Sequence, residues 1–138
     1  MSDASGHRLV NPDTLPPPVG YAHAVVAAPG RVVALAGQAG HRSDGSLPDS
    51  GLVPQFEQAA ANVAEALRAA GGRPEHLVQL LIFTTDIEGY RSSLRDVGAA
   101  YRTHFGKHYP AMALVGVTEL FDAAAVVELV GLAVIPEA

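Results

Sequence analysis

The sequence predicts an α+β fold in which a single β-sheet carries two helices on one of its faces. Two stretches have apolar residues at helical spacing, and five short runs rich in branched aliphatic residues are typical of strands. Along the chain the predicted order is β-β-α-β-α-β-β. Because a helix must cover its apolar stripe with a sheet face, both helices are expected on the same side of one sheet.

The first half of the chain contains a predicted hairpin, a loop and a helix. Residues 23–28 and 31–37 flank the turn pair Pro29–Gly30, which predicts a β-hairpin. Residues 38–50 are rich in Gly, Ser, Asp and Pro and are expected to form a loop. A helix should begin near Pro54 and end at Gly71–Gly72. Its apolar face would consist of Phe56, Ala60, Val63 and Leu67.

The second half contains three predicted strands and a further helix. Residues 77–85 favour a central strand, and residues 90–105 a helix that ends at Gly106. Asp86 and Glu88 precede this helix and are interpreted as capping residues. Residues 109–134 predict two strands joined by a short loop. These strands carry few polar residues, so the sheet face without helices must also be covered, and self-association is the expected cover.

Length and composition limit both the domain organisation and the function. The chain has 138 residues, which suits one domain: we expect an irregular proline-rich arm over residues 1–20 and a single domain over 21–138. The net charge of −5 and the scattered Lys and Arg argue against a nucleic-acid partner. The absence of cysteine excludes disulfides and thiolate chemistry. Without an apolar signal segment or membrane-length run, we expect a cytoplasmic protein with no membrane partner.

Glu128 is the most informative ionisable residue, because it interrupts an otherwise aliphatic strand over residues 126–134. A carboxylate in such a strand is either hydrogen-bonded and structural or poised for general acid/base chemistry. The residue pattern leaves both interpretations open. Asn62, within the first helix, is interpreted as a structural amide that bonds to the backbone. The histidines form no ligand set, so no metal site is expected.

Six segments of the chain, taken in order, resemble the Rid family of small enamine/imine deaminases, also called the RidA/YjgF family. They span most of residues 10–135 and are GYAHAV (20–25), ALAGQAG (34–40), QAAANVAEALRAAGG (58–72), TTDIEGY (84–90), HYPAMALVGV (108–117) and VVELVGLAV (126–134). The resemblance implies a chorismate-mutase-like fold with a mixed sheet of about six strands. It also implies a homotrimer whose sheets line a central barrel, with clefts between subunits.

The resemblance also implies a chemistry and a set of site residues. Family members hydrolyse reactive imines to a keto acid and ammonia, without cofactor or metal. Glu128 matches the family glutamate that acts on water, Tyr21 matches a cleft tyrosine, and Gly37 matches a glycine whose backbone lines the cleft. The family arginine that pairs with the substrate carboxylate follows an aromatic-Pro-Ala sequence. Here that sequence is Tyr109-Pro110-Ala111-Met112, and a helical asparagine of the family corresponds to Gly98.

From these residues we expect a cleft that binds a small, less acidic or uncharged ligand. Glu128 would be its catalytic centre, and its walls would be Tyr21, Gly37, Tyr109, Ala111 and Met112. The predicted activity is hydrolysis of an imine, an enamine or a similarly labile C–N bond. The alternative is a trimer that binds or senses a small molecule without catalysis. A ribonuclease is the least favoured option. Another arginine, such as Arg42, could replace the missing one.

Overall fold

The computed structural model describes residues 5–49 and 51–137, and the α+β class is confirmed. The first half contains β1 (Arg8–Val10), β2 (Ala24–Val26), β3 (Gly30–Ala34), β4 (Gln38–Ala39) and α1 (Leu52–Ala69). The second half contains a short 3₁₀ turn (Pro74–His76), β5 (Leu77–Thr84), α2 (Ile87–Ser92), α3 (Leu94–Phe105), β6 (Ala111–Gly116) and β7 (Val127–Pro136).

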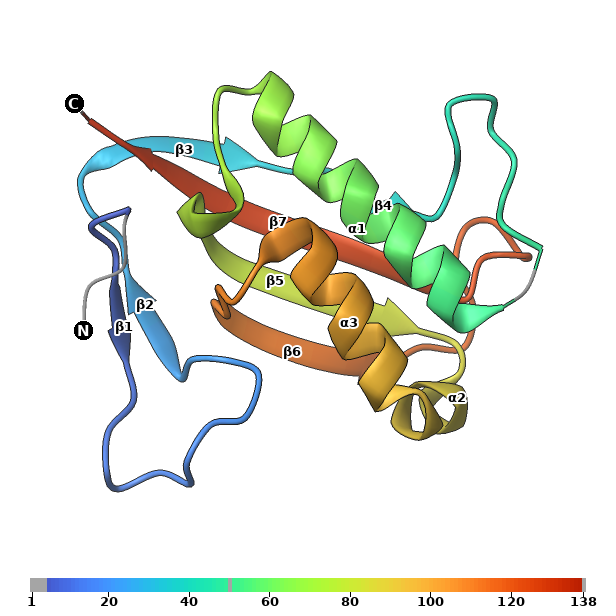
Figure 1. Cartoon of the computed structure of the whole chain (residues 1–138), viewed down its shortest axis with the longest axis horizontal. Coiled ribbons are helices and arrows are strands. Elements are labelled where there is room, and N and C mark those ends of the chain that lie inside the picture. The colour runs from blue at the N-terminus through green and yellow to red at the C-terminus, as the bar shows by residue number, and fades with distance from the viewer. Residues whose placement is uncertain (1–4, 50, 138) are drawn as a thin grey trace.

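The main sheet has five strands among the described residues, in the order β3-β7-β5-β6, with β4 also paired to β7. Pairs within it are antiparallel except β5 with β6, which run parallel. Strand β7 lies in the middle of the sheet and crosses most of the molecule (Figure 1). The mixed sheet therefore agrees with the expectation, although it has five strands rather than six.

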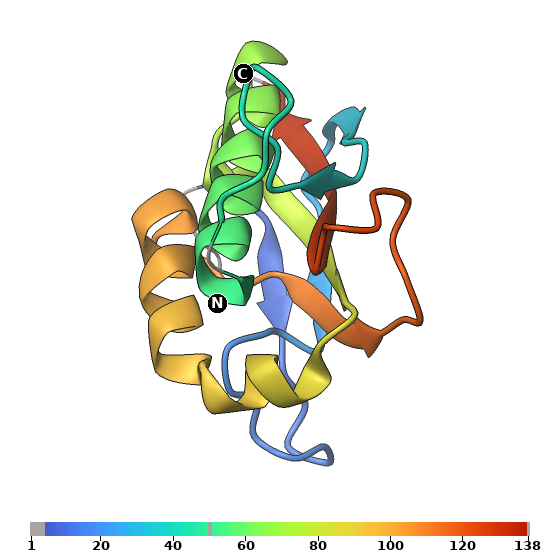
Figure 2. The ribbon, with the colours of Figure 1, turned by 90° about the vertical axis from the view of Figure 1, so that its right-hand side faces the viewer.

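The two long helices, α1 and α3, pack on one face of this sheet, as predicted (Figure 2). The predicted stripe of α1 is buried completely: Phe56, Ala60, Val63 and Leu67 are all inaccessible to solvent. They meet the inward residues of β5 and β7, including Leu80 and Leu129. Within the described ranges, no helix has the length and apolar character needed to cross a membrane.

The second predicted helix is divided at Ser93 into α2 and α3. Ser93 has φ −117° and ψ 17°, so the helix direction changes there. A pair of serines, Ser92 and Ser93, is a common place for such a break because serine competes for backbone hydrogen bonds. The predicted cap is confirmed, since the Asp86 carboxylate accepts a hydrogen bond of 2.8 Å from the Gly89 amide.

The predicted hairpin around Pro29–Gly30 is wrong. Strand β2 pairs with β1 instead, and β3 pairs with β7, more than 90 residues away. Gly30 permits the close pairing of β3 with β7, because a Cβ on this residue would collide with the backbone of Ile135. The glycine therefore serves close strand packing rather than a tight turn.

The arm is also more ordered than the sequence predicted, since residues 8–10 form β1. The side chain of His7 is fully buried. Its Nε2 donates to the Val134 carbonyl at 2.9 Å, and its Nδ1 accepts from the Ala28 amide at 2.9 Å. These two bonds tie the arm to β7 and to the segment after β2. A histidine can do this because its two ring nitrogens donate and accept separately.

Two further expectations need correction. The predicted loop 38–50 begins with a strand, β4, which pairs with β7 opposite Glu128. The connection between the last two strands is longer than the predicted short loop: residues 117–126 carry the chain from β6 to β7, past β5, which lies between them. Both features depend on pairing between distant segments, which local patterns do not encode.

The face of the sheet opposite the helices has no helix over it within the described chain (Figure 2). The strand registers place alternate residues of β3, β5, β6 and β7 on this face. Leu132 is 36% exposed and Val32 68% exposed there. We call this surface the open face; it consists of Val32, Ala34, Leu81, Phe83, Val115, Glu128, Val130 and Leu132.

Candidate functional site

A groove of 560 Å³ lies between β6, α3 and the segment that enters β2. Its walls are mainly aromatic and aliphatic, which is usual for small-molecule sites. We call it the aromatic groove. It is lined by Val19, Gly20, Tyr21, Ile82, Tyr90, Leu94, Val97, Gly98, Tyr101, Arg102, Tyr109, Met112, Ala113 and Leu114.

Tyr101 is the structural centre of the aromatic groove. Its ring stacks on Tyr109 with centroids 5.2 Å apart and planes 11° apart. Its hydroxyl donates a hydrogen bond of 2.6 Å to the His108 carbonyl. Burial raises the pKa of Tyr101, and it raises the pKa of Tyr90 to about 12. Both phenols therefore remain protonated near neutral pH, so they contribute no charge to the groove.

Tyr21 reaches the groove because the backbone beside it is pinned to the start of β6. The Ala22 amide donates to the Pro110 carbonyl at 3.0 Å, and Ala22 forms an isolated bridge with Ala111. These contacts place Tyr21 opposite α3, where it lines the groove. Of the predicted wall residues, Ala111 supplies this backbone contact but does not itself line the groove.

Met112 lies on the helix-covered side of β6. It pairs with Leu80, which is fully buried under the helices. Its Sδ is 3.9 Å from the Tyr101 hydroxyl. The structure thus brings Tyr21, Tyr109 and Met112 together in one groove.

Glu128 lies elsewhere, on the open face. It pairs with Phe83 of β5 and with Ala39 of β4, whereas Met112 belongs to the opposite side of the sheet. Within one chain, Glu128 is therefore separated from the aromatic groove by the thickness of the sheet.

Gly37 is the predicted wall residue that does lie beside Glu128. A Cβ built on Gly37 would be 2.5 Å from Oε2 of Glu128, closer than real Cβ atoms approach. Only glycine leaves space for the carboxylate at this place. Glu128 is half-buried, and no hydrogen bond or ion pair joins its carboxylate to another residue of the described ranges. The carboxylate is therefore available for a ligand or water.

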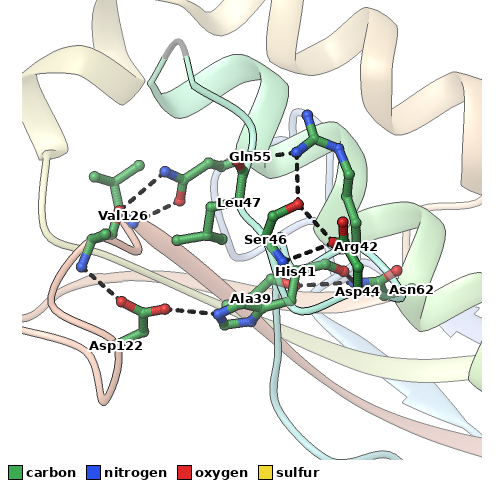
Figure 3. A network of polar contacts seen from close by, with 11 residues as sticks. Ala39, His41, Arg42, Asp44, Ser46, Leu47, Gln55, Asn62, Asp122 and Val126 are labelled. Carbon is green, nitrogen blue, oxygen red and sulfur yellow. Dashed lines mark hydrogen bonds and ion pairs between the residues drawn. The ribbon is translucent and has the colours of Figure 1, made fainter.

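Side chains from α1 hold the two segments that flank Glu128 (Figure 3). The amide nitrogen of Asn62 donates to the carbonyls of Ala39 and His41, at 3.1 and 2.7 Å, which confirms its predicted structural role. Gln55 accepts from the Val126 amide at 2.9 Å and donates to the Ala124 carbonyl at 3.1 Å. These bonds fix the strand opposite Glu128 and the turn that leads into β7.

A histidine–carboxylate pair also belongs to this network of hydrogen bonds. Nε2 of His41 donates to the Asp122 carboxylate at 2.8 Å, joining the loop after β4 to the loop before β7 (Figure 3). The hydrogen bond from His41, with one from the Ala124 amide, lowers the pKa of Asp122. Both side chains are more than a third exposed. The pair is therefore interpreted as a latch between loops.

Sequence reasoning missed several groove residues. Tyr90 and Leu94 lie on α2 and α3 facing β6, and Arg102 lies one helical turn after Gly98. The spacing of Gly98 and Arg102 is visible in the sequence, but the groove it faces depends on β6. Over the described ranges, no three His, Cys, Asp or Glu side chains gather closely enough to hold a metal ion.

Comparison with known proteins identifies related sequences and structures. The family model described as Endoribonuclease L-PSP matches residues 12–135. A goat protein named 2-iminobutanoate/2-iminopropanoate deaminase is 30% identical over 115 residues, which cover 82% of this chain and 80% of the relative. The human protein of the same name is 29% identical with the same coverage.

A solved structure of a Rid-family protein of unknown function from Yersinia pestis superimposes with a TM-score of 0.83 at 29% identity. The match covers 93% of this chain and 98% of the other. RidA from an Antarctic Psychrobacter gives a TM-score of 0.67 at 28% identity, covering 93% and 99%. The resemblance predicted from the sequence is thereby confirmed, and this chain belongs to the Rid (YjgF, Endoribonuclease L-PSP) family.

Proposed function

We propose that this protein hydrolyses a reactive imine or enamine in sites formed between copies of the chain. Water adds to the carbon of the C=N bond and gives a carbinolamine. The C–N bond then breaks to release ammonia and leave a carbonyl product. The names of the similar deaminases support this reaction class, and the chemistry requires a base for water and a proton for the departing amine.

The observation that carries the proposal is the unpaired carboxylate of Glu128 beside the backbone of Gly37. The glycine leaves the carboxylate accessible from the open face, and the helix residues Asn62 and Gln55 fix the backbone around it. Glu128 would accept a proton from the attacking water and return it to the nitrogen of the carbinolamine. One carboxylate can serve both steps, so the reaction balances without a cofactor.

The two halves of the site would be completed by self-association. Glu128 and the aromatic groove lie on opposite sides of one sheet, so a single chain does not bring them together. The open face exposes aliphatic residues that water solvates poorly, which favours its burial against other copies. We therefore propose a homotrimer in which Glu128 of one copy faces the aromatic groove of another. The small-molecule ligand would bind between them.

An imine-hydrolysis assay tests the function. An amino-acid oxidase would generate imines in situ from a panel of amino acids, and release of keto acid would be followed. We expect Glu128→Gln to reduce turnover about a hundredfold or more, because the amide cannot accept the proton. The matched control is Glu88→Gln, whose side chain is 92% exposed on α2; it should behave as wild type. Unchanged turnover in Glu128→Gln would refute the proposal.

A second candidate is a trimer that binds a small molecule without catalysis. The observation that favours it is Met112, a neutral residue at the position where the family carries an arginine. Wild-type protein without activity, together with activity gained in Met112→Arg, would support this alternative. A ribonuclease function finds less support, because the net charge is −5 and the groove has one basic residue.

A further inference from the structure

Arg102 is the feature of the aromatic groove that the proposed reaction does not yet use. Among the described residues that line the groove, it alone carries a charge. The remaining walls are aliphatic or are tyrosines, and burial keeps Tyr90 and Tyr101 protonated. A single cation beside an apolar surface is suited to a ligand that joins an anionic group to an apolar body.

Gly98 gives the guanidinium its position. The two residues are four apart on α3, so they lie on the same side of the helix. A Cβ built on Gly98 would lie 3.3 Å from Nη1 of Arg102. The guanidinium therefore lies over the glycine, along the groove wall, where a larger residue at position 98 would displace it.

Arg102 has no internal counter-charge. Its helical neighbours at three and four residues are Ala99, Gly98, Phe105 and Gly106, none of which is acidic. No hydrogen bond or ion pair engages its guanidinium within the described ranges. Arg68 and Arg91 differ, because each pairs with a glutamate three residues earlier. Arg102 can therefore bind an external anion without first breaking an ion pair.

Arg42, the replacement arginine considered from the sequence, is in a different situation. Its Nη1 donates to Ser46 Oγ and to the Leu47 carbonyl, both at 3.1 Å. It is thus used within its own loop, and it does not line the aromatic groove. Of the two arginines, Arg102 is the one placed to contact a ligand there.

We propose that Arg102 binds the carboxylate of the ligand, while the aromatic groove holds the ligand's apolar side chain. The ligand is then an acid with an aliphatic or aromatic side chain, a class that includes the 2-imino acids named for the similar deaminases. In this chain a helix would supply the cation, from the space left by Gly98, instead of strand β6, where Met112 is apolar. This class differs from the less acidic or uncharged ligand that the sequence predicts from Met112. The naming of the substrate rests on the proposed function; the carboxylate site does not.

The test measures equilibrium binding by calorimetry with 4-methyl-2-oxopentanoate, a stable keto acid with a branched apolar side chain. Its methyl ester has the same body without the charge. We expect wild type to bind the acid about tenfold or more tightly than the ester, since a charge-assisted hydrogen bond is lost in the ester. Arg102→Gln should remove this preference by weakening acid binding while leaving ester binding unchanged.

Two variants control this experiment. Arg95→Gln removes the same charge from an exposed position of α3 outside the groove and should bind the acid as wild type does. Arg102→Lys keeps the charge but loses the bidentate geometry, so it should bind the acid with intermediate affinity. Equal binding of acid and ester by wild type, unchanged acid binding in Arg102→Gln, or no acid binding at all would overturn the proposal.

The outcome separates this inference from the proposed function. Selective acid binding that needs Arg102, in a protein that hydrolyses no imine, would refute the proposed reaction and leave the carboxylate site standing. Imine hydrolysis that is abolished in Glu128→Gln but unaffected by Arg102→Gln would refute the carboxylate site and leave the reaction standing.

Discussion

The two faces of the main sheet differ in how completely the chain's own residues cover them. The helix-covered face has a closed core, and at its edge the aromatic groove is assembled from β6, α2, α3 and the segment before β2. The open face carries Glu128 among exposed aliphatic residues and has no cover of its own. The residues that line the groove are thus on one face, and the carboxylate that we propose to act on water is on the other.

In the proposed assembly, this difference between the two faces links self-association to activity. An exposed aliphatic sheet surface favours a partner through the hydrophobic effect, by roughly 25 cal/mol for each Å² buried. The same association would bring a carboxylate to a groove that lacks one. Burial and catalysis therefore share a single interface in the proposed assembly.

The largest expected effect follows from placing a charge on the open face. Leu132→Glu should prevent self-association, because a carboxylate buried without a partner is unstable. Imine hydrolysis should fall about a hundredfold or more, while binding of 4-methyl-2-oxopentanoate to the aromatic groove persists. Light scattering with size-exclusion chromatography and calorimetry measure these properties. Ala69→Glu, at an exposed site of α1, is the control. Full activity in dissociated Leu132→Glu would contradict the account.

A smaller effect is expected on the helix-covered side. Gly98→Ala adds a Cβ 3.3 Å from Nη1 of Arg102, so the guanidinium should shift by a few tenths of an ångström. Acid binding should weaken severalfold, while the free energy of unfolding rises by about 0.5–1 kcal/mol because alanine favours the helix. Calorimetry and urea denaturation measure the two changes. In an Arg102→Gln background, Gly98→Ala should not alter acid binding. An equal loss of affinity in both backgrounds would show that Gly98 does not act through Arg102.

The smallest effect concerns the latch beside Glu128. Hydrogen bonds from His41 and from the Ala124 amide lower the pKa of Asp122 below its ordinary 3.8. The folded state therefore favours the ionised form, and its stabilisation is complete above pH 3.8 and is lost as the pH falls below that value. Asp122→Asn should lower Tm slightly at neutral pH, and the difference from wild type should vanish in acid. A difference in Tm that does not change with pH would show that the ionised Asp122 carboxylate does not stabilise the folded state.

Local patterns predicted the helices and the central strand well. The Phe56–Leu67 stripe, the Gly71–Gly72 stop and the Asp86 cap are each encoded within a few residues, and the structure has all three. The partner of β2, the strand at β4 and the ordered arm were not predicted. Each depends on a segment that is distant in the sequence: His7 bonds to Val134, and Ala39 pairs with Glu128.

The candidate site, like the fold, was predicted only in part from the sequence. The family resemblance named Tyr21, Tyr109, Met112, Gly37 and Glu128, and the structure groups the first three in one groove and the last two on the other face. Which face each residue occupies follows from strand register, which one sequence does not reveal. Arg102 was missed because its significance depends on the groove beside Gly98 rather than on any motif.

The measurement that tests the central claim most directly is complementation between two defective variants. Glu128→Gln and Arg102→Gln, each with a different affinity tag, would be co-expressed, and assemblies carrying both tags would be purified. If Glu128 of one copy completes the groove of another, some sites in mixed assemblies are intact. Each mixed trimer then has one intact site of three, so the purified assemblies should show about a third of wild-type imine hydrolysis per trimer. Doubly tagged assemblies as inactive as either parent would contradict a site shared between copies.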